Sequence, residues 1–214
     1  MLKNIPTVFI IFGATGDLIS KKIIPALLHL YQKDKLPKLI RIIGFSRRGY
    51  SDRRFQQYVH FVLSKHEETS SRKKETEKFV SLFSYHQGNF NENASYKMLA
   101  RKLGRVDEEW KVCSNKLFYL AVPPHYYRSI FHHLADSGLT IPCGPDEGWT
   151  RVIVEKPFGK DLKTAEELDL LLAKLFKEEQ IYRIDHYLAK EMLQNILTFR
   201  FANNFLEQSW NNTF

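Results

Sequence analysis

Short apolar runs alternate along the chain with longer segments in which apolar residues recur at helical spacing. Four runs rich in Val, Ile, Leu or Phe are predicted strands: Thr7–Phe12, Leu39–Phe45, Lys116–Val122 and Arg151–Glu155. Runs without polar alternation suit strands that helices cover on both faces of a parallel sheet. The pattern therefore predicts an α/β fold, namely a Rossmann-like, doubly wound and mainly parallel sheet.

Helices are predicted between and after these strands. Apolar spacing places them around Leu18–Tyr31, Phe55–Val62, Tyr96–Leu103, Tyr126–Leu134 and Leu162–Phe176. Asp161 is the predicted N-cap of the last helix, because its carboxylate can accept hydrogen bonds from the first turn. The mixed-charge run Glu67–Lys78 indicates a solvated surface, and Thr140–Gly148, rich in Pro and Gly, indicates a loop.

The composition of the sequence changes beyond about residue 180. Tyr182–Tyr187 concentrates polar and aromatic residues, and the alternating run Leu197–Ala202 is a predicted strand. We therefore expect one domain at residues 1–178 and the beginning of a second, α+β domain at residues 179–214. Asn203–Phe214 adds no further core, so we expect the second domain to be truncated and the chain to be a fragment.

Composition excludes several classes of protein. The chain has 214 residues, of which 43% are hydrophobic and 26% charged, as in globular rather than disordered or collagen-like proteins. No run approaches the roughly 18 apolar residues of a membrane-spanning helix, so no membrane partner is expected. Cys113 and Cys143 lack paired spacing, which predicts unpaired thiols in a reducing, cytoplasmic location and no metal site.

The charge balance favours an anionic partner. The net charge is +8 at pH 7, and the pI is near 9.4. Charge alone does not choose between nucleic acid, an acidic surface and a phosphorylated small molecule. The basic residues are scattered, and no basic patch with interleaved aromatic residues is present, so nucleic acid is not expected.

A glycine turn follows the first predicted strand. Gly13-Ala14-Thr15-Gly16-Asp17-Leu18 lies between that strand and a helix, where a dinucleotide pyrophosphate binds in Rossmann folds. Gly13 permits a tight turn, and Gly16 lets a phosphate approach the backbone at the positive end of the helix. Ile11 occupies the first glycine position of the usual motif, so an ordinary strand-to-helix turn is the alternative interpretation.

The end of the second strand favours NADP over NAD. NAD sites usually place an acidic residue there for the ribose hydroxyls, whereas this chain has Arg47 and Arg48. A guanidinium group matches a 2′-phosphate through two charge-assisted hydrogen bonds. The alternative is that both arginines are solvated loop residues.

Two further motifs follow predicted strands. Glu155-Lys156-Pro157-Phe158-Gly159 ends the fourth strand, at the edge of the sheet where ligands bind, so Lys156 is positioned to contact both a cofactor and a substrate. Val122-Pro123-Pro124 ends the third strand and is expected to wall a nicotinamide pocket. Arg183–Glu191 combines four charged residues with a His and a Tyr, which suits a phosphate site at the entrance of a helix.

These motifs occur together, in order, in one known family. Residues 13–18, 44–47, 118–124, 155–159 and 183–191 closely resemble the motifs of glucose-6-phosphate dehydrogenases, and the resemblance covers essentially the whole chain. It implies NADP-dependent oxidation of glucose 6-phosphate to 6-phosphogluconolactone, the first step of the oxidative pentose phosphate pathway.

The resemblance also implies roles for single residues. NADP would be bound by Gly13, Ala14, Thr15, Gly16, Asp17, Leu18, Ile19, Ser20, Arg47, Tyr127 and Lys156. Glucose 6-phosphate would be bound by Lys156, His186, Tyr187 and Lys190. Asp185 resembles the carboxylate partner of the family's catalytic histidine.

The chain departs from the family pattern at three points. Ala189 stands where the family has glycine, and Ile19 stands where it has a small residue. The family's catalytic histidine lies downstream of the matched region, and this chain has no residue that matches it. We therefore expect the chain alone to be inactive, and a homo-oligomer to form only with a full-length chain.

Two alternative functions remain at this point. One is a non-catalytic NADP-binding remnant, which would fit the missing histidine. The other is a sugar dehydrogenase of the glucose-fructose oxidoreductase type, whose members also carry Glu-Lys-Pro after a Rossmann strand. The Arg183–Glu191 motif argues against the second alternative.

Overall fold

The computed structural model describes residues 5–65, 73–144, 148–159, 161–184, 191–206 and 210. Contacts divide the chain into two units, Met1–Tyr182 and Arg183–Phe214, each of which is described by itself. The strands are β1 Thr7–Phe12, β2 Ile40–Ser46, β3 Phe83–Gln87, β4 Asn115–Leu120, β5 Thr150–Glu155 and β6 Ile181–Ile184. The α-helices are α1 Ile24–Gln32, α2 Asp52–Ser64, α3 Lys73–Ser81, α4 Asn93–Trp110, α5 Tyr127–Asp136, α6 Leu162–Leu175 and α7 Glu191–Ala202. Short helices are η1 Ile19–Ile23, η3 Pro124–Tyr126, η4 Glu178–Gln180 and η5 Asn204–Leu206.

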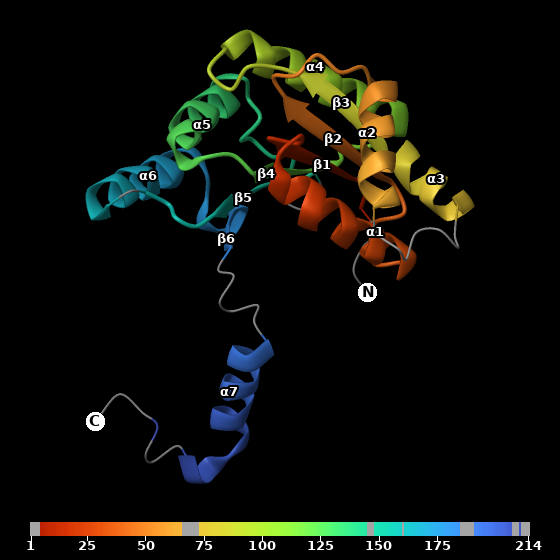
Figure 1. Cartoon of the computed structure of the whole chain (residues 1–214). Coiled ribbons are helices and arrows are strands. Elements are labelled where there is room, and N and C mark those ends of the chain that lie inside the picture. Colours follow the sequence, from red (N-terminus) through yellow and green to blue (C-terminus); the bar gives the residue numbers. More distant parts are fainter. Residues whose placement is uncertain are drawn as a thin grey trace. The chain divides into compact units, whose positions relative to one another are not determined.

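The six strands form one sheet in the order β3-β2-β1-β4-β5-β6 (Figure 1). β1 pairs in parallel with both β2 and β4, β2 with β3, and β4 with β5. The direction in which successive strands are added reverses between β1 and β4. β2 and β3 are added on one side of β1, and β4, β5 and β6 are then added on its other side. This arrangement confirms the prediction of a doubly wound, mainly parallel α/β sheet.

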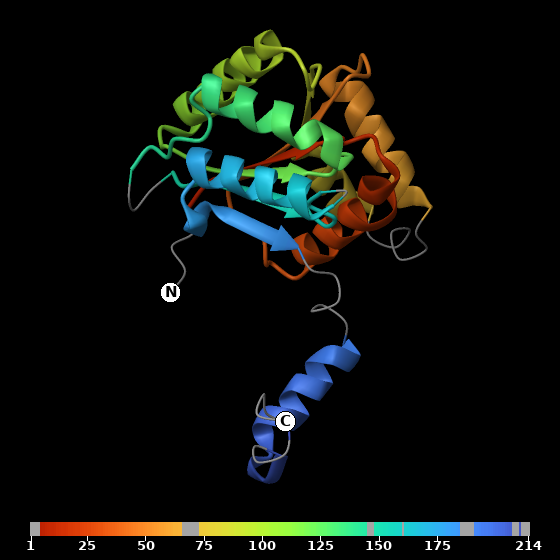
Figure 2. The same cartoon turned by 90° about the vertical axis from the view of Figure 1, so that its left-hand side faces the viewer.

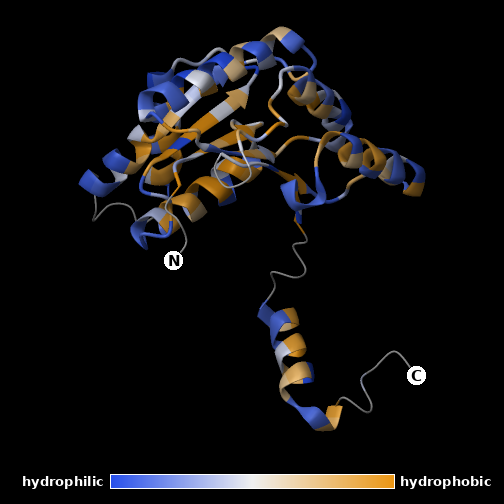
Figure 3. Cartoon of the chain, turned by 180° about the vertical axis from the view of Figure 1, so that it is seen from behind, coloured by the Kyte–Doolittle hydropathy of each residue, from blue (hydrophilic) through white to orange (hydrophobic). Residues whose placement is uncertain are grey.

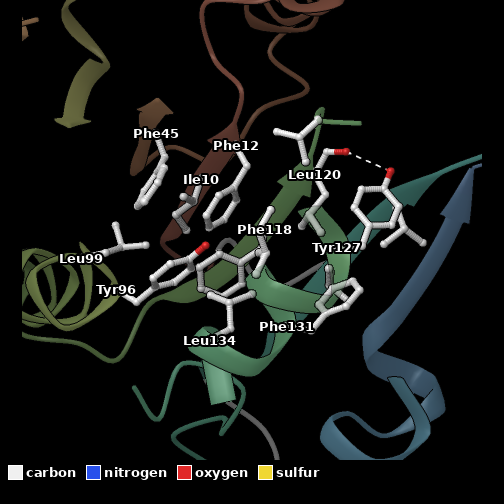
Figure 4. Packing of buried hydrophobic residues seen from close by; sticks show 14 of the residues in the cluster. Ile10, Phe12, Phe45, Tyr96, Leu99, Phe118, Leu120, Tyr127, Phe131 and Leu134 are labelled. Atoms are coloured by element: carbon white, nitrogen blue, oxygen red, sulfur yellow. Dashed lines mark hydrogen bonds between the residues drawn. The ribbon is translucent and has the colours of Figure 1, made fainter. Parts of the chain in front are cut away.

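The helices of the first unit, α1 to α6, lie in two layers on opposite faces of the sheet (Figure 2). α1, α2 and α3 contact one another, whereas α4 contacts α5 and α5 contacts α6. Apolar strand residues are buried against the layer formed by α4, α5 and α6, and Figure 4 shows how they pack. This core includes Ile10, Phe12, Phe45, Phe118 and Leu120 from the strands and Tyr96, Leu99, Tyr127, Phe131 and Leu134 from the helices.

Most predicted elements are confirmed, with shifts of up to three residues at their ends, except that α4 continues seven residues beyond the predicted end at Leu103. Asp161 caps α6 as predicted, because its carboxylate accepts a hydrogen bond from the Thr164 backbone N–H at 2.8 Å. Two strands were not predicted. β3 reads Phe-Ser-Tyr-His-Gln and β6 is four residues long, so neither presents an uninterrupted apolar run.

Side chains satisfy the outward-facing backbone of β3, which lies at one edge of the sheet. The Tyr85 N–H donates to Asp52 Oδ1 at 2.6 Å, and Lys102 Nζ donates to the Tyr85 carbonyl at 2.7 Å. Gln56 Nε2 donates to the Phe83 carbonyl at 2.8 Å. Groups that would otherwise pair with another strand are therefore occupied, which protects the edge against association.

The second unit contains α7 and η5. The predicted strand Leu197–Ala202 is wrong, because these residues form the end of α7. The run alternates in polarity, but it continues a segment from Glu191 that has no helix breaker, and the longer helix prevails. Figure 3 shows apolar residues along α7, and none of its described side chains is buried.

None of the helices in the described ranges is both long and apolar enough to cross a membrane.

The two cysteines are paired, which corrects the prediction of separate thiols. Cys113 and Cys143 form a disulfide whose Cα atoms are 6.4 Å apart. Thirty positions separate them in sequence, and the fold of β4 and α5 brings them together, so spacing did not reveal the pair. The prediction of a reducing, cytoplasmic location loses this argument.

Replacement of Lys102 by Met tests the protection of the β3 edge. The variant retains the apolar stem but leaves the Tyr85 carbonyl without its ammonium donor, so we expect a loss of about 1–3 kcal/mol in unfolding free energy. Lys97→Met, at an exposed position of the same helix, is the matched control. Urea denaturation measures both, and equal midpoints for the two variants would contradict the interpretation.

Candidate functional site

The carboxyl ends of the parallel strands meet at one edge of the sheet. Gly13 follows β1, Arg47 follows β2, Ala121 follows β4 and Lys156 follows β5. The strand order reverses between β1 and β4 at this edge, and doubly wound sheets bind ligands at such a point. All four positions belong to motifs that the sequence analysis selected.

The turn at Gly13 is fixed between two neighbouring strands. The Gly13 N–H donates to the Phe45 carbonyl of β2 at 2.9 Å, and the Ala121 N–H donates to the Phe12 carbonyl of β1 at 3.2 Å. Gly13 has a φ of 78°. A Cβ at this position would lie 2.4 Å from the Ala121 carbonyl oxygen, so both the conformation and the contact require glycine.

The rest of the turn leads directly into a helix. The Gly16 N–H donates to the Gly13 carbonyl at 2.9 Å. The hydroxyl groups of Thr15 and Ser46 lie 3.2 Å apart, within hydrogen-bond distance, and join the turn to the end of β2. Ala14 is fully buried beneath the turn. The backbone N–H groups at the start of this helix are thereby placed at the switch point of the sheet, as a phosphate site requires.

The first helix contains a wide π-helical turn, η1. The Ile24 N–H donates to the Ile19 carbonyl, five residues earlier, and Pro25 follows immediately. Proline lacks an N–H and clashes with a carbonyl four residues before it, which explains the local widening. η1 begins at Ile19, the position at which the sequence analysis expects a small residue in similar proteins. The Ile19 side chain is buried.

Asp17 is paired within the same helix. Lys21 Nζ donates to Asp17 Oδ2 at 2.9 Å, and this hydrogen bond with its attraction lowers the pKa of Asp17. The Ser20 hydroxyl donates to the Asp17 carbonyl at 3.1 Å. The Lys21 ammonium group therefore offsets the negative charge of Asp17. The partial positive charge of the helix N-terminus next to the turn is thereby preserved.

Arg47 and Arg48 are exposed at the end of β2. The Tyr85 hydroxyl lies beneath them and donates to the carbonyls of Ser46 at 3.1 Å and Arg48 at 2.7 Å. Burial raises the pKa of Tyr85, so this hydroxyl is a neutral donor at neutral pH. The loop that presents the two guanidinium groups is held from inside the protein, next to the glycine turn.

A cavity of about 210 Å³ joins the glycine turn to the ends of β4 and β5. Its lining residues are Leu18, Leu120, Ala121, Val122, Pro123, Pro124, Tyr127, Glu155 and Lys156. Most of these residues have apolar side chains, and the charged groups among them, Glu155 and Lys156, come from the end of β5. Lys156, a predicted site residue, is exposed, and the Lys156–Pro157 peptide bond is cis.

Tyr127 lies beneath this cavity rather than at its mouth. Its side chain is 1% exposed. Its hydroxyl donates to the Leu120 carbonyl at 3.3 Å (Figure 4). It also accepts from the Glu155 N–H at 3.3 Å. The structure therefore places Tyr127 among the lining residues, with its hydroxyl bound to the ends of β4 and β5.

Glu155 and Tyr119 were not selected as site residues by the sequence analysis. Tyr119 of β4 donates a hydrogen bond to Glu155 Oε1 at the end of β5. Burial and the adjacent carboxylate raise the pKa of Tyr119, which keeps its hydroxyl protonated. The available signal was a tyrosine hydroxyl in the apolar run 117–120 of β4, but a contact across 36 residues depends on strand pairing.

A second cavity of about 470 Å³ lies on the other side of the Pro157 loop. It is bordered by η3, the start of α5 and α6, and Arg128 and Glu167 face each other across it at 3.9 Å. It shares Pro124 with the first cavity.

Four predicted site residues lie outside the described residues. These are Asp185, His186, Tyr187 and Lys190. The structure therefore brings together the glycine turn, Arg47, Tyr127 and Lys156, and the expected sugar-phosphate residues remain predictions.

Comparison with protein families gives one match that covers most of the chain. Residues 10–195 match the family model described as glucose-6-phosphate dehydrogenase, NAD binding domain. This description supports binding of a nicotinamide dinucleotide. It does not support the alternative of a glucose-fructose oxidoreductase-type enzyme.

Curated relatives carry the same family name. The chain is 39% identical over 206 residues to glucose-6-phosphate 1-dehydrogenase 2 of Mycobacterium tuberculosis (strain ATCC 25618 / H37Rv), covering 96% of this chain and 40% of the relative. It is 43% identical over 205 residues to the Borreliella burgdorferi enzyme, with the same two coverages, 96% and 40%. The chain thus spans about two fifths of the length of these relatives.

Solved structures agree with the fold. A structure described as glucose-6-phosphate dehydrogenase in complex with its substrate glucose-6-phosphate superposes with a TM-score of 0.84 at 39% identity, over 99% of this chain and 43% of that chain. The crystal structure of glucose-6-phosphate 1-dehydrogenase from Mycobacterium avium gives a TM-score of 0.77 at 30% identity, over 96% of this chain and 42% of that chain.

Replacement of Gly13 by Ala tests the requirement for glycine at the turn. We expect a loss of about 2 kcal/mol or more in unfolding free energy, because alanine adds a left-handed backbone cost and a clash with the Ala121 carbonyl. Gly104→Ala is the control, since a Cβ there meets nothing within 4 Å and a helical alanine should stabilise by about 1 kcal/mol. Urea denaturation compares them, and similar effects of the same sign would refute the interpretation.

Proposed function

The chain belongs to the glucose-6-phosphate dehydrogenase family, and we propose that it supplies the NADP-binding part of an enzyme that oxidises D-glucose 6-phosphate to 6-phospho-D-glucono-1,5-lactone. The observation that carries this proposal is the glycine turn at the switch point of the sheet, with Arg47 at the adjacent strand end. NADP, when bound, supplies the acceptor for the hydride from C1 of the sugar.

The residues of the turn fit a pyrophosphate. Gly13 has no room for a side chain, and the backbone N–H groups after it begin a helix whose partial positive charge favours anions. Lys21 neutralises the Asp17 carboxylate, which would otherwise repel a phosphate. We assign pyrophosphate binding to residues 13–20 on these grounds.

Arg47 is the proposed determinant of NADP over NAD. It is exposed at the end of β2, and Thr15 of the glycine turn lies against Ser46, immediately before it. A 2′-phosphate bound at this edge would meet a guanidinium group instead of the carboxylate that suits NAD.

Lys156, which follows β5, is the one proposed substrate residue within the described ranges. Lys156 lies at the cavity between the glycine turn and β4, where one ammonium group can contact both ligands. His186, Tyr187 and Lys190 are proposed to bind the sugar phosphate, and Asp185 to orient and polarise a histidine base. We propose that residues 179–214 begin the substrate domain, and the apolar surface of α7 supports this because such helices lie inside larger domains.

The isolated chain is expected to bind NADP without turning over substrate. No residue of this sequence matches the family's histidine base, and the loss of a general base usually costs about 10²–10⁴-fold in rate. Absorbance at 340 nm with NADP and glucose 6-phosphate measures turnover, and calorimetry measures binding. Robust NADPH formation by the purified chain would contradict this expectation.

Replacement of Arg47 by Ala tests the assignment of the cofactor. We expect NADP affinity to fall about 10–100-fold, because a charge-assisted contact is lost, while NAD affinity changes little. Arg101→Ala, an exposed position on α4, is the control and should affect neither cofactor. Calorimetric titrations of the wild-type chain and both variants give six dissociation constants, and an equal loss for NADP and NAD would assign Arg47 to the fold instead.

A further inference from the structure

We propose that the Cys113–Cys143 disulfide is a thiol–disulfide exchange site, which a dithiol opens by attack on Cys143 Sγ with Cys113 leaving as a thiolate beside the Lys116 ammonium group. Cys113 precedes β4, and Cys143 lies in the segment before β5. The bond is therefore near the amino ends of these strands, at the opposite end of the sheet from the glycine turn. The inference goes beyond the proposed function and does not depend on it.

The two cysteines differ in their access to solvent. Cys143 is exposed, whereas Cys113 is only partly exposed in the connection from α4 to β4. In thiol–disulfide exchange a thiolate must reach one sulfur while the other sulfur leaves, so access helps to decide which of the two is attacked. The difference in exposure therefore favours attack at Cys143 and departure of Cys113.

Two side chains of opposite charge lie next to the sulfur that would leave. Lys116 Nζ is 3.7 Å from Cys113 Sγ, and Asp107 Oδ2 is 3.8 Å from it. Lys116 also donates to Asp107 Oδ2, while Asp107 Oδ1 accepts from the Ser114 N–H at 3.0 Å. An ammonium group stabilises a thiolate and makes it a better leaving group, and a carboxylate opposes it. The two charges thus act in opposite directions on one atom.

Gly148 fits closely against the bond. The Cys143 N–H donates to the Gly148 carbonyl at 3.2 Å. Gly148 has a φ of 66°, and a Cβ there would lie 2.9 Å from Cys113 Sγ and 3.0 Å from Cys143 Cβ. Both the conformation and the contact require glycine. The backbone therefore holds Cys143 next to Cys113 by a contact other than the covalent bond, which allows the bond to form again after reduction.

The strands on either side are joined without the disulfide. The Trp149 N–H donates to Asn115 Oδ1 at 3.2 Å, and the Lys116 N–H donates to the Trp149 carbonyl at 2.8 Å. Parallel pairing of β4 with β5 then begins at Lys116 and Thr150. Reduction is therefore expected to leave the sheet intact, while it removes a constraint on the unfolded chain between two positions 30 residues apart.

The exchange balances in two steps. A thiolate of the dithiol bonds to Cys143 Sγ, the S–S bond breaks, and its electron pair leaves with Cys113, which takes up a proton. The second thiolate of the reagent then attacks its own sulfur in the mixed disulfide and releases Cys143, which is also protonated. Overall, the dithiol is oxidised to a disulfide, and the protein gains two thiol groups.

The position of a trapped mixed disulfide tests the proposal on the unmodified 214-residue chain. The oxidised protein is treated with glutathione, a monothiol, and free thiols are alkylated rapidly before peptide mass spectrometry. We expect glutathione on Cys143 and the alkyl group on Cys113. The opposite labelling would overturn the proposal. Reduction by dithiothreitol should also be first order in the reagent, and a rate independent of its concentration would show that the bond is not attacked directly.

Variants test the two charges through the rate of reduction by dithiothreitol. Lys116→Met should slow reduction about 3–10-fold, because the leaving thiolate loses its ammonium neighbour, and Lys116→Arg should restore the rate. Asp107→Asn should accelerate it. Lys97→Met, at an exposed position of α4, is the matched control and should have no effect. Equal rates for Lys116→Met and the wild-type chain would contradict the assignment, and the glutathione experiment decides the proposal even if this variant does not fold.

Thermal unfolding distinguishes an exchange site from a purely structural bond. The reduced chain should unfold in a cooperative transition about 10 °C below that of the oxidised chain, as the loss of a cross-link over this separation implies. Oxidised glutathione should restore the original midpoint. A reduced chain that is already unfolded at room temperature, or that does not recover its disulfide, would make the bond a structural cross-link and overturn the proposal.

Discussion

The candidate site depends on one close approach between two backbones. Gly13 after β1 lies against Ala121 after β4, at a separation that excludes even a methyl group. Parallel pairing of β1 with both β2 and β4 brings the two segments to the same edge, and the bonds from Gly13 to Phe45 and from Ala121 to Phe12 fix them there. The pairing of the apolar strands and the lack of a side chain at Gly13 are therefore both needed for this one backbone contact.

Buried tyrosine hydroxyl groups support the loops around this contact. Tyr85 holds the segment that presents Arg47, Tyr119 holds the Glu155 side chain, and Tyr127 joins the ends of β4 and β5. Burial raises the pKa of all three. They therefore remain neutral donors at neutral pH, and the framework of the site does not depend on titration in this range, in contrast to a framework built from histidines.

The sequence predicts the parts of this protein that local pattern determines. Continuous apolar runs identified β1, β2, β4 and β5, and the glycine residues identified the turn after β1 at which we propose a phosphate site. The sequence analysis missed β3, because this strand forms through pairing with β2 and through the Asp52 and Lys102 side chains that bond to its outer edge. The Tyr119–Glu155 bond and the cysteine pair follow from strand and loop placement, to which residue spacing gives no access.

The side chains that cover the β3 edge make this edge of the sheet a poor site for pairing with a further strand. A foreign strand that approached Tyr85 would have to displace an ammonium and a carboxylate group already bonded to the backbone, which opposes templated growth and strand exchange at that end. β6 forms the other edge. Of the two edges, β3 is therefore the one at which the bonded side chains oppose the addition of a further strand.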